Sequence, residues 1–136
     1  MNVPENAVRT PYRVPYADTD MMGVVYYGNY LTLFERSRNE LMRALGPSYA
    51  QMEADGLMLP VIEAHVDYRA PARYDDMLEI AAWLSEAHGV RCKVRNAVLR
   101  GGELLASGWT VHACVDAKSR RPTRLPEWLK EKVVQD

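Results

Sequence analysis

The stretch YADTDMMGVVYYGNY, residues 16–30, places two aspartates two positions apart, with a glycine three residues after the second. Carboxylates in such a pattern can bind calcium, shape a turn or act as a general base on a carbonyl compound. Asp18, Asp20 and Gly23 match positions one, three and six of a calcium loop. A methionine and an asparagine, however, stand at positions five and twelve, and calcium needs a bidentate glutamate at the twelfth. The stretch therefore does not predict a calcium site.

The side chains that zinc or a non-haem metal prefers are dispersed along the chain. His65, His88 and His112 show no ligand spacing. Cys92 and Cys114 form neither a CxxC pair nor a disulfide framework, so two reduced thiols in or near the core are expected. We therefore expect neither a metal nor a cofactor.

Asp20 is the better candidate for chemistry, because the apolar and aromatic run MMGVVYY follows it. Burial against such a surface would raise its basicity. Gly23 can adopt positive φ or allow a close backbone approach. The chain then enters a predicted helix, whose first N–H groups are unpaired and carry the positive end of the dipole. A carboxylate that faces such amides is suited to carbonyl chemistry. Asp18 and Thr19 are typical turn formers, and Asp18 could instead bond to loop amides.

The usual nucleophiles of acyl transfer are missing from the sequence. It has no GxSxG motif, no cysteine beside a histidine and no Ser-His-Asp candidate in order. In an acyl-transfer enzyme of this sequence, the carboxylate itself would have to do the work.

A long amphipathic helix is predicted over residues 29–45. Asn29 is a favourable N-cap residue, and Gly46 is a natural stop after the last turn. One face carries residues at helical spacing: Tyr30, Leu33, Phe34, Ser37, Leu41, Ala44 and Leu45.

Strand-like segments flank this helix on both sides. Residues 8–16 carry two prolines, which cannot donate to a ladder, and so predict an edge strand. Four runs follow the helix, with turns at His88-Gly89 and Gly101-Gly102. One strand, one long helix and an antiparallel meander predict an α+β fold with the helix on one sheet face. The four runs are residues 57–68, 77–87, 90–99 and 104–115.

Length and composition predict one globular domain over residues 1–136, with a loose N-terminal tail at 1–7 and a short helix from Pro126. The chain is 48% hydrophobic and 26% charged. Its formal charge of -1 gives no overall attraction to nucleic acid or an acidic membrane. It shows neither a leader segment nor an apolar run of membrane-spanning length, so a cytoplasmic protein is expected.

Three blocks of the sequence resemble, in order, the signature of hotdog-fold acyl-CoA thioesterases of the 4-hydroxybenzoyl-CoA thioesterase and YbgC-like group. The first is YADTDMMGVVYYGNYLTLFERSRNELMRALG. The second is VDYRAPARYDDMLEI, in which a proline and an Asp-Asp pair precede a strand. The third is DAKSRRPTRLPEWL. Together they span about Tyr12 to Leu129. The resemblance implies a five-stranded antiparallel sheet wrapped around one long central helix. It also implies homodimers joined edge to edge, often paired into homotetramers as dimers of dimers.

The resemblance also implies a role for particular residues. The catalytic carboxylate falls on Asp20, as general base or as nucleophile, and the backbone N–H that polarises the thioester carbonyl falls on Tyr27. Tyr16 matches a tyrosine that supports the site in YbgC-like members. Many of those members have histidine at the position of Tyr27, whereas the hydroxybenzoyl-CoA branch has tyrosine. Residues near these are expected to contact the substrate: Gly23, Val25, Tyr26 and Tyr30.

An acyl-CoA substrate would need cations for its phosphates, and Arg69, Arg73 and Arg121 are the favoured candidates. Several readings stay open. The acyl group could be short-chain or aromatic, and an acyl-carrier protein could replace coenzyme A. A non-catalytic acyl-CoA-binding module is a further alternative. Hydratases of the same fold need a histidine five residues after the aspartate, where this chain has Val25.

Overall fold

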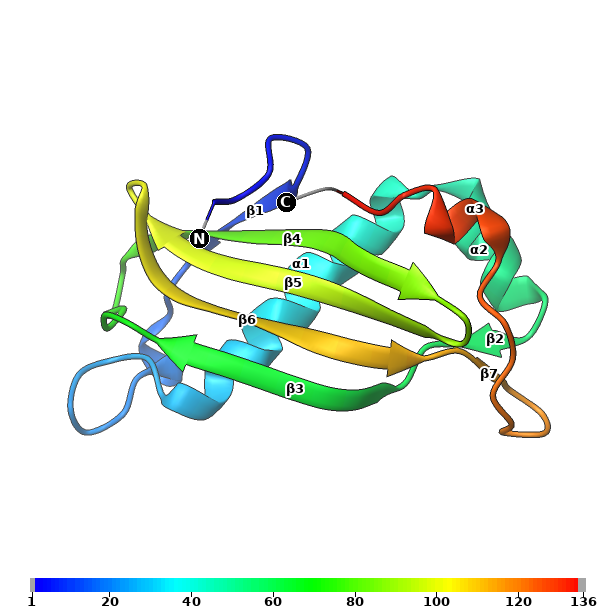
Figure 1. Ribbon diagram of the computed structural model, residues 1–136. Helices are drawn as coiled ribbons and strands as arrows, with labels where there is room; N and C mark the ends of the chain where they lie inside the picture. The colour runs from blue at the N-terminus through cyan, green and yellow to red at the C-terminus, as the bar shows by residue number, and fades with distance from the viewer. Residues whose placement is uncertain (1, 135–136) are drawn as a thin grey trace.

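A computed structural model describes residues 2–134, and in it a five-stranded antiparallel sheet lies against one long helix, α1 (Tyr30–Ala44) (Figure 1). The strand order is β1-β4-β5-β6-β3, and every neighbouring pair is antiparallel. This arrangement confirms the predicted α+β class and the hotdog fold that the resemblance implies. The strands are β1 (Val8–Arg13), β3 (Val61–Tyr68), β4 (Met77–His88), β5 (Arg91–Arg100) and β6 (Glu103–Ala113).

Shorter elements surround this frame. The run predicted as one strand over 57–68 divides into β2 (Leu57–Met58) and β3, and β2 pairs with β7 (Val115–Asp116). Pro60 stands at the division, where it has no N–H to offer a ladder. The remaining helical elements are α2 (Pro47–Ala54), α3 (Glu127–Lys130) after Pro126, and two 3₁₀ turns, η1 (Tyr16–Asp18) and η2 (Tyr27–Asn29).

Helix α1 packs on the sheet through the face predicted from its spacing. Leu33, Phe34 and Ser37 are buried, although Ala44, expected on the same face, is exposed. Gly108 on β6 allows the close packing, because a Cβ there would lie 2.9 Å from the Phe34 ring and 2.0 Å from a backbone oxygen of β3. A side chain at this position would therefore push the helix and β3 away from β6.

Asn29 occupies the predicted N-cap position of α1, but its side chain does not cap the helix. Its Nδ2 donates instead to the carbonyl of Asp18 at 2.9 Å. The physical reason is that η2 already brings the chain into a helical conformation before α1, and Asn29 has φ -74° and ψ -15°. A capping side chain acts from an extended backbone.

Two clusters of buried residues lie under α1, one near each of its ends. The first core cluster, toward the start of α1, includes Val14, Val25, Tyr30, Leu33, Phe34 and Leu78. The second core cluster, toward its end, includes Met42, Met52, Leu84, Cys92, Cys114, Leu125 and Leu129.

The N-terminal segment expected to be loose is partly packed. Val3 and Ala7 contact a third cluster, formed by Ala81, Trp83 and Ala97. Among the described residues, no helix combines the length and apolar character needed to cross a membrane.

Candidate functional site

A cleft of about 380 Å³ opens where the segment before α1 meets the end of β3. Five of the predicted site residues line it, namely Asp20, Val25, Tyr27, Tyr30 and Arg69. The others in its wall, which the site prediction did not include, are Met22, Val24, Tyr68, Ala70 and Pro71. The segment from 68 to 71 lies about forty residues further along the chain. Only its pairing with the rest of the sheet brings it here, so local spacing gave no signal for it.

Asp20 stands at the base of a tight turn. Its N–H donates to the Val24 carbonyl at 2.9 Å, and its carbonyl accepts from the N–H of Gly23 at 2.9 Å. Gly23 has φ +77°, which explains the glycine. The Asp20 Oδ1 accepts from the Met22 N–H at 2.9 Å, while Oδ2 has no hydrogen-bond partner within residues 2–134. One carboxylate oxygen is therefore held and the other is available to a substrate or a water molecule.

The expected burial of Asp20 by the methionines that follow it is wrong for the single chain. Met21 and Met22 have relative exposures of 105% and 83%, because the turn places them at its tip. The buried apolar neighbours are instead Val25 and Tyr30, at 4% and 3%. Asp20 itself is half-buried.

Tyr27 begins η2, the turn that leads into α1. The N–H groups of Tyr26 and Asn29 are both bonded, to the carbonyls of Asp18 and Tyr26 respectively, each at 2.9 Å. The Tyr27 N–H has no such partner in the described part of the chain. Its carbonyl accepts a hydrogen bond from the Tyr68 hydroxyl at 2.8 Å. Free N–H groups at a helix start favour negative charge, so this peptide is suited to bind an oxyanion.

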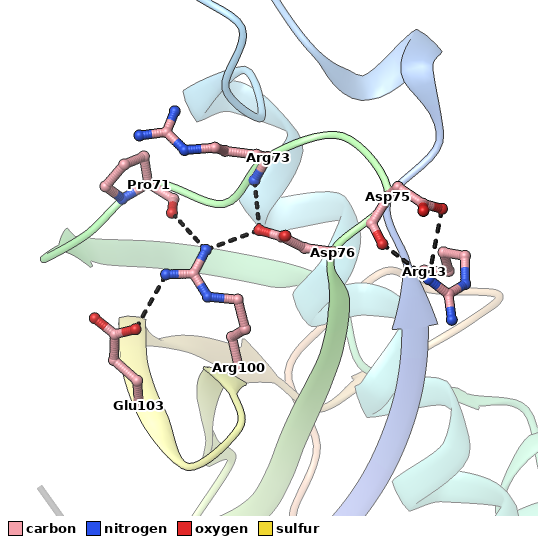
Figure 2. A network of polar contacts seen from close by, with 7 residues as sticks. All are labelled: Arg13, Pro71, Arg73, Asp75, Asp76, Arg100 and Glu103. Atoms are coloured by element: carbon pink, nitrogen blue, oxygen red, sulfur yellow. Dashed lines mark hydrogen bonds and ion pairs between the residues drawn. The ribbon is translucent and has the colours of Figure 1, made fainter.

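The far wall of the cleft is fixed by a polar network around Asp76, which Figure 2 shows. The Asp76 Oδ2 accepts from the Arg73 N–H and from Arg100 Nη1, both at 2.8 Å. Arg100 also donates to the Pro71 carbonyl at 3.2 Å and to Glu103 at 3.0 Å. The backbone N–H of Arg73, and then Arg100, lower the pKa of Asp76. The network therefore contains a permanent carboxylate at neutral pH.

This wall is joined directly to the segment that carries Asp20. The Val25 N–H donates to the Ala72 carbonyl at 2.8 Å, and Val24 forms a bridge with Arg73. The Arg73 side chain points away from the network, so its guanidinium is not used there (Figure 2). The Asp-Asp pair of the second sequence block thus positions the loop, a role that only its three-dimensional contacts reveal.

Asp18 lies in the turn η1, as expected for a turn-forming residue, but within residues 2–134 its carboxylate does not bond to loop amides. Its Oδ2 accepts a hydrogen bond from the Tyr12 hydroxyl at 2.5 Å. Its backbone carbonyl accepts from the Tyr26 N–H and from Asn29 Nδ2, each at 2.9 Å. Asp18 therefore connects β1, the segment before η2 and the start of α1.

Five predicted site residues lie outside the cleft wall, namely Tyr16, Gly23, Tyr26, Arg73 and Arg121. Tyr16 is exposed and its ring meets Tyr74 edge to face at 5.7 Å. The Tyr26 ring lies 4.6 Å from the Tyr27 ring, tilted by 45°, and Tyr26 is also exposed. Arg121 lies in the turn after β7, at the opposite end of the sheet from the segment before α1 (Figure 1). Within one chain, Arg121 is therefore remote from Asp20.

No group of three or more histidine, cysteine, aspartate or glutamate side chains that could hold a metal ion occurs in residues 2–134. His65 instead stacks on Trp109 at 4.3 Å, and His112 is buried in contact with Thr110 and Leu59.

Comparison with known proteins gives consistent matches over most of the chain. Residues 14–133 match the family described as the thioesterase-like superfamily. The acyl-CoA thioester hydrolase YbgC of Escherichia coli O6:H1 is 35% identical over 120 residues, covering 88% of this chain and 90% of that protein. The 1,4-dihydroxy-2-naphthoyl-CoA hydrolase of Synechococcus elongatus is 28% identical, covering 87% and 88%. The crystal structure of the DHNA-CoA thioesterase of Staphylococcus aureus has a TM-score of 0.81 and 32% identity, over 92% of this chain and 85% of that one.

Proposed function

This chain belongs to the thioesterase-like superfamily and is a thioester hydrolase, and we propose that it cleaves an acyl-CoA into the free acid and coenzyme A. One observation carries the proposal. Within residues 2–134, one carboxylate oxygen of Asp20 and the backbone N–H of Tyr27 have no hydrogen-bond partner, and both residues line the same cleft. In this proposal, Asp20 supplies the base or nucleophile and the Tyr27 N–H holds the oxyanion.

The chemistry follows one of two routes. As a general base, Asp20 takes a proton from water while the oxygen attacks the thioester carbonyl. As a nucleophile, the Asp20 carboxylate attacks first and expels the coenzyme A thiolate, and water then cleaves the mixed anhydride. In both routes negative charge develops on the carbonyl oxygen, where one backbone donor is worth roughly 3–4 kcal/mol of barrier. The thiolate is a good leaving group, so neither route requires a strong general acid.

The acyl group is short-chain or aromatic in this proposal. The cleft is small and its wall is mostly aromatic and apolar, with Tyr27, Tyr30 and Tyr68 around it. The Synechococcus relative, by its name, acts on an aromatic acyl-CoA, which supports the aromatic choice. An acyl-carrier protein as the donor and a non-catalytic acyl-CoA-binding module remain the alternatives to be tested.

We also propose a homodimer formed through β3, one of the two edge strands of the sheet. Seven of its eight residues are exposed, among them Val61, Ile62 and Tyr68 at 47–50%. An exposed apolar edge strand is a ready partner for a second copy. Antiparallel pairing of two β3 strands places the Val61 end of one copy beside the Tyr68 end of the other. Pairing of two such dimers into a homotetramer is part of the same proposal.

Dimerisation would explain the predicted role of Arg121. Its turn lies toward the Val61 end of β3 and the cleft lies at the Tyr68 end (Figure 1). In an antiparallel dimer, the turn of one copy therefore faces the cleft of the other. Arg69 and Arg73 from one chain, with Arg121 from the second, would then bind the coenzyme A phosphates.

Because the proposed chemistry needs no metal or cofactor, EDTA should leave the rate unchanged. We place the enzyme in the cytoplasm, acting without nucleic acid or membrane.

Thiol release from a panel of acyl-CoAs and acyl-carrier-protein thioesters tests the function. The panel covers short aliphatic and aromatic acyl groups, and the variants are Asp20→Asn and, as a matched control remote from the cleft, Asp55→Asn on the loop after α2. We expect Asp20→Asn to lower kcat by at least about 100-fold, the scale of general-base catalysis, while acyl-CoA still binds. Asp55→Asn should retain the wild-type rate. Full activity in Asp20→Asn would contradict the assignment, and no release from any substrate by the wild type would favour a binding module.

A single turnover in ¹⁸O-labelled water tests for the anhydride route. An anhydride cleaved at the aspartyl carbonyl leaves label in Asp20, which mass spectrometry of the peptide detects. Label confined to the product acid shows that water attacked the carbonyl of the acyl group, in the thioester or in the anhydride.

A further inference from the structure

Three hydrogen bonds converge on Asp18, which borders the cleft without lining it. The carboxylate accepts from the Tyr12 hydroxyl at 2.5 Å, and the backbone carbonyl accepts from the Tyr26 N–H and Asn29 Nδ2 at 2.9 Å each. Tyr26 and Asn29 flank the Tyr27-Gly28 pair. Whatever holds Asp18 in place therefore also sets the direction of the peptide that carries the Tyr27 N–H.

Tyr12 is a rigid donor for this purpose. It lies on β1, pairs with Leu78 of β4 and packs against the first core cluster. The Arg36 guanidinium of α1 lies over its ring at 5.3 Å. Burial, and then the hydrogen bond to Asp18, raise the pKa of Tyr12 to about 12, so the hydroxyl keeps its proton at neutral pH. Both the position and the protonation state of the donor are thus constant.

The alternative attachments of Asp18 are local and weaker as constraints. Its N–H donates to the Pro15 carbonyl at 3.1 Å, within η1 and the residue before it. The hydroxyl of neighbouring Thr19 likewise donates to the Tyr16 carbonyl, at 2.7 Å. These bonds shape the turn but do not connect it to the sheet. The Tyr12 hydroxyl provides that connection through a side chain of the sheet itself.

From these contacts we infer that Tyr12 is a positioning residue for catalysis, which acts through Asp18 to hold the Tyr27 amide in register with Asp20. Asp20 lies two residues after Asp18, and Tyr27 follows the residue bonded to the Asp18 carbonyl. Asp18 is therefore linked to both reacting groups of the cleft, in addition to the bond from the Val25 N–H to the Ala72 carbonyl. This inference rests on the proposed function, and it adds two residues, Tyr12 and Asp18, that touch no substrate.

The test compares Tyr12→Phe, Asp18→Ala, Asp18→Asn and the double variant Tyr12→Phe/Asp18→Ala. Tyr49→Phe is the matched control, because it removes a tyrosine hydroxyl beside the second core cluster. We expect Tyr12→Phe and Asp18→Ala each to lower kcat about tenfold with KM within about twofold, since the lost contact orients a transition-state donor. The double variant should lose no more than either single variant, because both remove the same interaction. Asp18→Asn keeps an acceptor oxygen and should stay within about threefold of wild type.

Hydrogen exchange of the Tyr26 amide gives a readout that does not depend on turnover. Its N–H is bonded to Asp18, so Tyr12→Phe should speed its exchange about tenfold while Tyr49→Phe leaves it unchanged. If the wild type hydrolyses no thioester, the proposed function fails and the exchange rates alone still decide the positioning. Wild-type kcat together with wild-type exchange in Tyr12→Phe, or losses that multiply in the double variant, would overturn the inference.

Discussion

The two ends of helix α1 share one helix and one sheet but differ in what covers them. At its end, the second core cluster is closed by α2, α3 and the C-terminal segment, whose Met52, Leu129 and Val133 pack together. At its start, loops held by hydrogen bonds leave Asp20, Tyr27 and Tyr68 lining an open cleft. Apolar packing excludes solvent at the end of α1, whereas hydrogen bonds hold the loops at its start and leave a cleft between them.

The difference decides which groups can react. Cys92 and Cys114 lie buried at the closed end, and burial raises the pKa of the Cys92 thiol to about 12. A thiol with such a pKa is a poor nucleophile at neutral pH. The open end has the opposite character, since one oxygen of Asp20 and the N–H of Tyr27 lack partners in the part of the chain that the structure describes. Activity and stability should therefore separate between the two ends.

The largest effect on activity is expected from Tyr27→Pro, which deletes the proposed oxyanion donor. Proline suits this position, because Tyr27 is the first residue of a helical turn and Tyr26 before it is extended, with ψ 132°. We expect kcat to fall about 100- to 1000-fold, the scale of one oxyanion donor. Tyr27→Phe keeps the N–H and is the control, with a rate near wild type. Steady-state kinetics measures kcat, and thermal melting shows that each variant is folded. Equal kcat values in the two folded variants would contradict the prediction.

Leu129→Ala should produce the complementary result at the closed end. Leu129 is 1% exposed within the second core cluster, so the truncation leaves a cavity. We expect the free energy of unfolding to fall by about 2–5 kcal/mol, as for other buried leucines. Urea denaturation measures this loss, and kcat per folded molecule should not change. A tenfold loss of kcat in the folded variant would show that the two ends are coupled.

The same contrast explains what the sequence could predict. Helix α1, the hairpin at Gly101-Gly102 and the edge position of β1 follow from periodicity and turn chemistry, and the structure confirms them. The family resemblance assigns roles to Asp20 and Tyr27, which lie seven residues apart in one sequence block. The structure brings both residues to one cleft.

The parts that sequence could not predict depend on distant contacts. Tyr68 reaches the Tyr27 carbonyl, Tyr12 reaches Asp18 and Arg100 reaches Asp76 only after the sheet has formed. No periodicity or spacing relates these pairs. The exposure of Met21 likewise depends on a turn closed by backbone bonds, which apolar composition does not reveal.

A smaller effect is expected from Tyr68→Phe, which removes one bond from the open end and leaves the ring in place. The lost hydroxyl donates to the Tyr27 carbonyl at 2.8 Å, so the residue that bears the oxyanion donor loses one of its hydrogen bonds and gains freedom. A net hydrogen bond of about 0.5–1.5 kcal/mol corresponds to a two- to tenfold loss of kcat. Tyr74→Phe, at an exposed tyrosine outside the cleft wall, is the control. An unchanged kcat in Tyr68→Phe would mean that the position of the Tyr27 N–H does not depend on the hydrogen bond to the Tyr27 carbonyl.

The smallest effect is a pH dependence of stability from His112, which is buried near the closed end. Its Nδ1 lies 2.9 Å from the Leu59 carbonyl and must donate to it, so Nε2 accepts from the Thr110 hydroxyl at 2.8 Å. Burial lowers the pKa of His112, and the nearby charge of Arg38 acts in the same direction. At pH values between this lowered pKa and the ordinary value of about 6.5, His112 binds a proton in the unfolded chain but not in the folded chain.

Stability should therefore rise as the pH increases toward about 6.5 and fall as it decreases below that value. Asp76 does not contribute to the pH dependence in this range, because its lowered pKa affects stability only below about pH 4. Melting temperatures between pH 5 and 7.5 test the effect, with His112→Gln compared with wild type. The variant should be less stable overall, yet its melting temperature should depend less on pH. Equal slopes in both proteins would remove His112 as the cause and leave the pH response to exposed groups.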